Sequence, residues 1–297
     1  MTRNYSIIAL LLHDMTKPAF DIVPAAWAQD DLLNSILLME ISEKLFGYVV
    51  YSKEQKQLLG LRQYHLDISA EHSTAQALNE IIANDGLLQQ RWKQPVVIYN
   101  FPDSSLLPDS YFDIGMNKSI TELLFGNAFK GLILSEKIPA WDVYNIYRIQ
   151  REIHGAMQQK FSGGRYWHYY SLLLSTIDKQ EEVPSSFLKC IFYPEKFIVA
   201  LIKEKKLQLL QTYHYETPED VSYYLLSISV QCDLIQEELR LNVSGLIDQQ
   251  SALYTELIKY FQHIDCDQLP ETIQTKGLLQ NLPPHYFSTL LKMTTCV

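Results

Sequence analysis

Cysteine is scarce and scattered in this sequence. The chain has 297 residues and four cysteines, Cys190, Cys232, Cys266 and Cys296. No two of them form a Cys-x-x-Cys pair, so a zinc site has little support. Cys190 falls in an expected strand and Cys232 on an expected helix, and both are expected to be small buried hydrophobic residues. A reducing, cytoplasmic compartment fits this pattern best.

Basic residues are fewer than acidic ones, and long apolar runs are absent. Lys and Arg together number 25 against 34 Asp and Glu, which gives a formal net charge of −9. This balance argues against a broad nucleic-acid surface, which needs clustered Lys and Arg. No run approaches the roughly 20 apolar residues that span a bilayer. We therefore expect neither nucleic-acid binding nor a membrane span.

The N-terminus contains a short apolar run, Ser6–Leu12, that resembles the core of a signal peptide. Residues 26–28 (Ala-Trp-Ala) even have the form of a cleavage site, but polar residues from His13 onward interrupt the run. Met15 is available as an alternative start. We expect residues 1–19 to be an N-terminal extension, of which residues 1–14 add nothing to the core.

Motifs of common enzyme classes are also absent from the sequence. The eight His residues show no HExxH or HxH spacing, and no G-x-S-x-G is present. Gly163-Gly164 lacks the Lys-Ser/Thr that completes a P-loop. Glu219 and Asp220 fit charges at a helix N-terminus better than a catalytic pair. We predict no metal site and no catalytic residue.

What the sequence does contain is an ordered pattern of elements from Phe187 to Gly245. Short polar turns separate three strand-like runs. Thr217 then fits a helix N-cap and Pro218 the first helical turn, and residues 239–243 form a fourth strand. The three runs are Phe187–Tyr193, Phe197–Lys203 and Leu207–Tyr215.

The same order occurs earlier in the chain. Three runs precede an amphipathic helix at residues 73–83 and an almost continuously apolar strand at residues 95–101. The earlier runs are Leu33–Ile41, Gly47–Ser52 and Gln57–Asp67. We interpret the repeat as an internal duplication of fold.

The residues between the two patterns predict strands at 130–138 and 141–149 and helices at 151–161 and 166–177. An aromatic cluster at Tyr166, Trp167, Tyr169 and Tyr170 fits core packing, with a partner-binding surface as the alternative. The polar run at 178–184 is typical of a linker. It divides the chain into halves at residues 20–178 and 185–297, the second ending with helices at 249–261 and 285–293.

Five segments carry a resemblance to a known family. The most specific is Leu207–Leu226, and the others are Ser104–Asp113, Asp142–Ile149, His168–Leu173 and Pro284–Leu291. They resemble an uncharacterised family of Bacteroidetes proteins with an actin-like ATPase fold. The resemblance implies an α/β fold with mixed sheets, in which two ribonuclease-H-like halves, each β-β-β-α-β-α, face a cleft. It also implies distant similarity to assembly proteins such as FtsA and PilM.

Actin-like ATPases hold phosphates in two hairpin turns, one per half. Glycine lets the backbone approach the phosphates, and Asp orients the metal and water. In the first turn of this chain Glu40 stands for the Asp, but Ser42 replaces the glycine. In the second turn Pro194 removes an amide donor. Ser244-Gly245 is either a remnant of the adenosine-binding turn or a plain strand-to-helix turn, and we favour the latter.

Lys44 and Lys196 follow the two turns. They are candidate phosphate ligands, but exposed turn lysines are the interpretation we favour. We therefore expect a non-catalytic, actin-like scaffold or assembly protein that binds a protein partner and no cofactor. The alternative is an actin-like ATPase that holds ATP with Mg through Glu40, Ser42, Ser244 and Gly245. A ribonuclease-H-like nuclease would need several acidic metal ligands, and Glu40 alone does not supply them.

Overall fold

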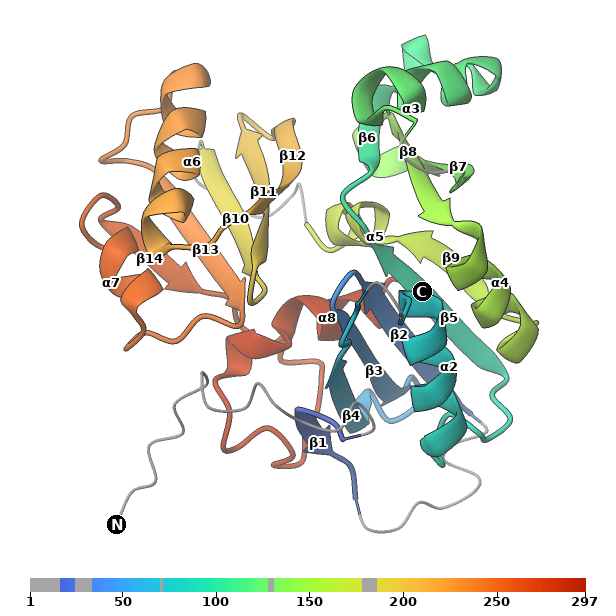
Figure 1. Ribbon diagram of the computed structural model, residues 1–297. Helices are drawn as coiled ribbons and strands as arrows, with labels where there is room; N and C mark the ends of the chain where they lie inside the picture. The colour runs from blue at the N-terminus through green and yellow to red at the C-terminus, as the bar shows by residue number, and fades with distance from the viewer. Residues whose placement is uncertain (1–16, 25–33, 70–71, 128–130, 178–185) are drawn as a thin grey trace.

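Strands with hydrophobic residues on both faces form the sheet of the first half. Its strand order is β1-β4-β3-β2-β5-β9. β2, β3 and β4 are antiparallel neighbours, whereas β5 runs parallel to β2 and β9 parallel to β5 (Figure 1). The strands are β1 (Phe20–Ile22), β2 (Ser35–Ser42), β3 (Leu45–Ser52), β4 (Gln57–His65), β5 (Gln94–Asn100) and β9 (Arg165–His168). The computed structural model describes residues 17–24, 34–69, 72–127, 131–177 and 186–297.

The second half repeats this topology in a sheet of order β12-β11-β10-β13-β14. β10, β11 and β12 are antiparallel neighbours, and β13 runs parallel to β10. The predicted order of three strands, a helix and a fourth strand is therefore confirmed in both halves. The strands are β10 (Ser186–Phe192), β11 (Lys196–Lys203), β12 (Lys206–His214), β13 (Arg240–Gly245) and β14 (His263–Cys266).

A capping box starts the helix that follows the three strands in each half. Ser73 caps α2 (Thr74–Asn84) together with the Gln76 side chain. Thr217 and Asp220 do the same for α6 (Pro218–Gln231), as the sequence predicted for Thr217. Each box satisfies backbone amides that the first helical turn leaves without partners.

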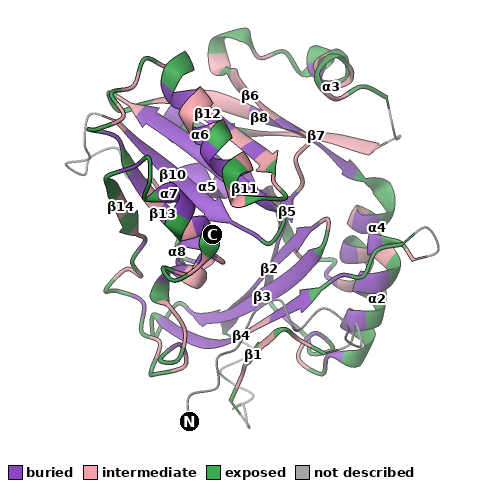
Figure 2. Ribbon diagram, turned by 60° about the vertical axis from the view of Figure 1, so that its left-hand side comes forward, coloured by how far each residue is buried: buried purple, intermediate pink, exposed green. Residues whose placement is uncertain are grey.

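Residues on opposite faces of each sheet enter different cores. Ile36 and Leu38 of β2 and Ile198 of β11 belong to one inner cluster. Leu37 and Met39 pack outward against α2 and α4 (Arg151–Lys160). In the second half, the outward residues meet α6 and α7 (Ala252–Leu257). Figure 2 shows that the strands beneath these helices are largely buried.

The inner cluster joins the two halves. It contains Tyr169 and Leu173 of α5 (Tyr169–Ser175) and Leu291 of α8 (Ser288–Met293), which lie between the two sheets. The C-terminal segment also pairs with the first half, because the amide of Leu58 donates to the carbonyl of Gln274. One continuous hydrophobic core therefore spans the region between the halves.

A third, smaller sheet of order β6-β8-β7 projects from the first half. Helix α3 (Asn117–Phe125) lies against it. An ion pair holds this sheet in place, in which the buried Arg148 guanidinium binds the Asp103 carboxylate at 2.6 Å. The strands are β6 (Ser104–Pro108), β7 (Gly131–Ile138) and β8 (Val143–Gln150).

The predicted helix at 166–177 is wrong in its first turn. Residues 165–168 form β9, and the helix begins only at Tyr169, because the His168 side chain caps it by accepting from the Tyr170 amide. Of the aromatic cluster, Tyr169 and Tyr170 are core residues, as predicted.

Helix α7 is also shorter than the predicted 249–261, since Ser251 caps it. The C-terminal helix α8 begins at Ser288, after a 3-10 turn at 284–286. Cys190 is buried as predicted, whereas Cys232 is half-buried, and all four cysteines are free. The predicted N-terminal extension up to residue 16 and the predicted linker lie outside the described residues. Among those described, none of the helices has the length and apolar character to cross a bilayer.

Asp85, directly after α2, is a heavily bonded carboxylate of the first half. It is 4% exposed and accepts the hydroxyl protons of Tyr48 and Tyr64, both at 2.7 Å. The Arg62 guanidinium donates at 3.0 Å and the Leu87 amide at 2.9 Å. Asp85 thus ties β3 and β4 to the end of α2.

We predict that Asp85→Ala lowers the free energy of unfolding by about 3 kcal/mol or more, because two buried hydroxyls and the Leu87 amide lose their acceptor. The Arg62 guanidinium, whose side chain is 21% exposed, also loses one of its two carboxylate partners. The matched control is Asp21→Ala, which removes the half-exposed second partner of Arg62 and should cost less than about 1 kcal/mol. Urea denaturation of both variants measures the difference. Equal losses would contradict this account of Asp85.

Candidate functional site

The two predicted phosphate turns face each other across the cleft between the halves. Glu40 lies near the end of β2 and is 4% exposed. Its Oε1 accepts the hydroxyl proton of Tyr193, which follows β10, at 2.6 Å. The same oxygen accepts the amide of Asn100, at the end of β5, also at 2.6 Å. A tyrosine of the second half therefore reaches directly to the acidic residue of the first.

Ion pairs reinforce this contact at its edge. The Lys44 ammonium of the first turn binds the Glu195 carboxylate of the second. Lys196 in return approaches Glu43 at 3.8 Å. Each turn thus supplies one carboxylate and one ammonium to the other, and their charges are balanced within the protein.

Lys44 and Lys196 differ in their surroundings. The side chain of Lys44 is 64% exposed, as predicted. The prediction of an exposed Lys196 is wrong, because its side chain is only 7% exposed and donates to the Asn100 carbonyl at 2.8 Å. Lys196 is the first residue of β11, and its side chain faces the first half. Burial lowers the pKa of its ammonium, and the nearby carboxylate of Glu43 opposes that shift.

Burial is the largest influence on the pKa values of Glu40 and Tyr193. It raises the pKa of Glu40, and the hydrogen bonds from Tyr193 and Asn100 and the charge of Lys196 only partly offset this effect. The pKa of Tyr193 is also raised well above its ordinary value, first by burial and then by the charge of Glu40. The phenol therefore keeps its proton and acts as the donor.

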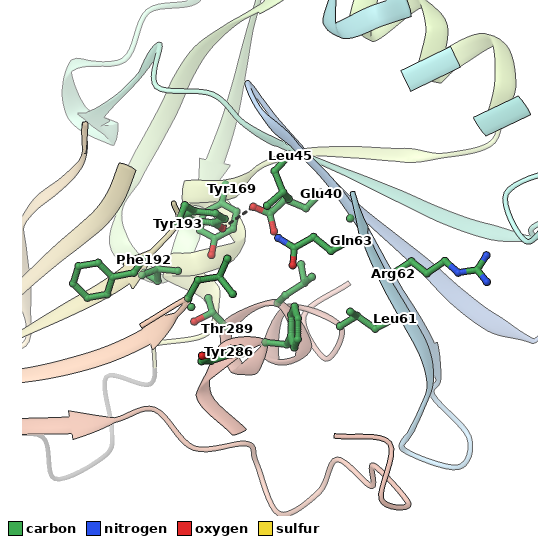
Figure 3. A pocket seen from close by; sticks show the side chains of 16 residues that line it. Glu40, Leu45, Leu61, Arg62, Gln63, Tyr169, Phe192, Tyr193, Tyr286 and Thr289 are labelled. Carbon is green, nitrogen blue, oxygen red and sulfur yellow. Dashed lines mark hydrogen bonds between the residues drawn. The ribbon is translucent and has the colours of Figure 1, made fainter. Parts of the chain in front are cut away.

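Little space remains between the two turns. A cavity of ≈ 40 Å³ lies there, which has room for only a few water molecules. Tyr193 and Tyr169 lie on one side of it and Tyr286 on another (Figure 3), and Phe287 also lines it. Aromatic side chains thus line the space beside Glu40, where the resemblance predicts a nucleotide.

The cavity brings together two of the four predicted site residues, Glu40 and Gly245. The other two, Ser42 and Ser244, are buried and do not line it. The Ser42 hydroxyl donates within its own turn to the Leu45 carbonyl at 3.3 Å, and the Ser244 hydroxyl bonds that of Thr289 on α8 at 2.9 Å.

Sequence reasoning missed the roles of Asn100 and Tyr193. A signal existed for Asn100, because it ends an apolar strand that is parallel to β2, and parallel strands end at the same edge of a sheet.

Gly245 has a structural reason of its own. Its φ is +81°, and a Cβ atom there would lie 2.2 Å from the Phe192 carbonyl oxygen. That same oxygen accepts the Leu246 amide at 2.8 Å. The close approach of two strand ends thus requires glycine, and this supports the plain-turn interpretation of Ser244-Gly245.

Comparisons with known proteins agree with this architecture. The model of a family described as "Protein of unknown function (DUF3822)" matches residues 26–264. A search of curated proteins finds no significant match.

Solved structures give the fold. A Bacteroides thetaiotaomicron protein with actin-like ATPase fold and unknown function aligns with a TM-score of 0.77 at 14% identity, covering 92% of this chain and 100% of its own. A chain of the PilM-PilN type IV pilus biogenesis complex aligns with a TM-score of 0.59 at 11% identity, covering 88% and 98%. The protein therefore has the actin-like ATPase fold, and the resemblance found in the sequence is confirmed.

We predict that Glu40→Gln keeps the protein at least as stable at neutral pH and reduces the pH dependence of its stability. Because the pKa of Glu40 is raised on folding, its contribution falls as the pH rises from about 4.5 through the folded-state pKa. Gln keeps an oxygen acceptor for Tyr193 and Asn100 but does not ionise.

Urea denaturation at several pH values measures this effect. Glu40→Ala is the matched control, and it should cost about 1–3 kcal/mol because both donors lose their acceptor. An unchanged pH dependence in Glu40→Gln would count against a raised pKa.

We also predict that Gly245→Ala destabilises the protein by more than about 3 kcal/mol, because the methyl group meets the Phe192 backbone and φ is positive. The control is Gly155→Ala in α4, where an added Cβ meets no other group. That change should stabilise the helix by about 0.5–1 kcal/mol. Thermal unfolding of both variants decides, and a Gly245→Ala protein of wild-type stability would refute the requirement for glycine.

Proposed function

This chain belongs to the DUF3822 family of proteins of unknown function, and from that premise we propose that it is a non-catalytic, actin-like scaffold or assembly protein. It acts by binding a protein partner, in a reducing, cytoplasmic compartment. The cleft between its halves serves as a structural joint.

The observation that carries the proposal is the direct bonding of the two phosphate turns. Tyr193 donates to Glu40, and Lys44 binds Glu195 across the cleft. In an ATPase, preorganised amides and cations in this place would hold phosphate oxygens and a metal. Here the cations bind carboxylates of the protein itself, and the phenol bonds the carboxylate expected to orient the metal.

A solved relative of this fold supports the second part of the proposal. PilM is described in a complex with PilN that serves type IV pilus biogenesis. An actin-like chain can thus present a surface to a protein partner. We propose the same mode of action here, with a partner of its own.

One observation favours the nucleotide-binding alternative. Lys196 is a buried lysine at the position of the second phosphate turn, and its ammonium lies 3.8 Å from the Glu43 carboxylate. If the halves separated, Lys196 and Lys44 together could bind a phosphate group. ATP with Mg is then the ligand to test.

We predict that MgATP does not raise the melting temperature of the protein and is not hydrolysed. A ligand at 100 times its Kd would add about 2.7 kcal/mol of stability, so even weak binding is measurable by thermal unfolding. Tyr193→Ala, which removes the ring beside Glu40, tests whether the closed joint alone prevents binding.

Turnover of radiolabelled ATP completes the test, with Glu40→Ala as the control. Stabilisation of the wild-type protein by MgATP would overturn the proposal. Turnover that disappears in Glu40→Ala would make Glu40 catalytic.

A further inference from the structure

A second, larger hollow lies far from the closed joint. A groove of ≈ 740 Å³ separates the small third sheet from the second half. β6 and the end of α3 form one wall, and the β11–β12 turn and β12 form the other. In Figure 1 these elements face each other across the upper part of the molecule.

Both walls of the groove end in an edge strand. β12 pairs only with β11, and β6 pairs only with β8, among the strands that the structure describes. An edge strand carries backbone amides and carbonyls that can pair with an added strand. Two such edges bordering one groove favour an extended peptide as the occupant.

Apolar side chains lie along the groove and continue beyond its rim. Leu106 and Leu209 are half-buried inside it. Leu124 of α3 lines the groove and is 53% exposed, and its neighbour Leu123 is 83% exposed. The segment that leads into α3 exposes Tyr111 and further large hydrophobic residues. Surface of this kind is typical of a contact with another protein.

The charge of the groove differs from that of the whole chain. Lys205 and Lys206, at the β11–β12 turn, line it and are exposed. No ion pair of either lysine occurs in the described part of the chain, and Asp142 is the one acidic residue of the described lining. With two lysines against one aspartate, the described lining carries a net positive charge in a protein of net charge −9, and this suits a carboxylate.

We propose that the groove binds an extended segment of a protein partner, which pairs as an added strand with β12. Its apolar side chains pack on Leu124 and Leu209, and an acidic side chain or C-terminal carboxylate binds Lys205 and Lys206. This inference rests on the proposed function, since it names the surface through which the scaffold binds its partner.

The experiment uses the full chain and a displayed library of random linear peptides as the probe. Selected peptides should be apolar with an acidic residue, and hydrogen exchange should show new protection of the amides at residues 206–211. Leu124→Asp and Lys205→Glu should each weaken peptide binding about tenfold.

Two matched controls separate the groove from general effects. Leu123→Asp changes the neighbouring exposed leucine, which does not line the groove. Lys56→Glu reverses a charge in the corresponding turn between β3 and β4, where Lys56 has a positive φ as Lys205 does. Both controls should bind the peptides as the wild type does.

The outcomes distinguish this inference from the proposed function. Peptides that bind but protect another surface, or that are insensitive to Leu124→Asp and Lys205→Glu, overturn the groove and leave a protein-binding function standing. If no peptide is selected, or if self-association of the chain protects residues 206–211, the proposal that a partner's extended segment binds here is overturned. Stabilisation by MgATP bears on the proposed function alone.

Discussion

The hydrogen bond from Tyr193 to Glu40 is the interaction on which the arrangement of the two halves depends. A buried carboxyl group is costly unless it is protonated or bonded, and this one receives two donors on a single oxygen, from Tyr193 and from Asn100. Since one donor comes from each half, the group is satisfied only when the halves are together. The two turns that the resemblance predicts to hold phosphate are thus bonded to each other here.

The C-terminal segment also contributes to the contact between the two halves. Asp267 binds the ammonium groups of Lys189 at 3.2 Å and of Lys292 at 2.6 Å, and also accepts the Ser288 hydroxyl proton at 2.8 Å. These bonds fix α8 to the sheet of the second half, while Leu291 of α8 enters the core shared with the first half. The space between the turns is therefore small, and a wider groove lies beside β12.

Local patterns predicted most of the fold because turns, caps and alternation are local. Thr217 identified a helix start, and the polar turns at 53–55 and 204–206 identified hairpins. Contacts across the cleft were not predictable in this way. The burial of Lys196 depends on how the second half faces Asn100. β9 forms because β5 offers its edge to residues 165–168, whose Tyr and Trp lead into an apolar stretch that suits a helix.

A double-mutant cycle between Glu40 and Tyr193 tests the joint most directly. Urea denaturation of Glu40→Ala, Tyr193→Phe and the double variant gives the coupling energy of the pair. This account predicts a coupling of about 1 kcal/mol or more, in a single unfolding transition that includes both halves. Losses that add to within about 0.3 kcal/mol would show that the two residues act independently and would contradict a joint between the phosphate turns.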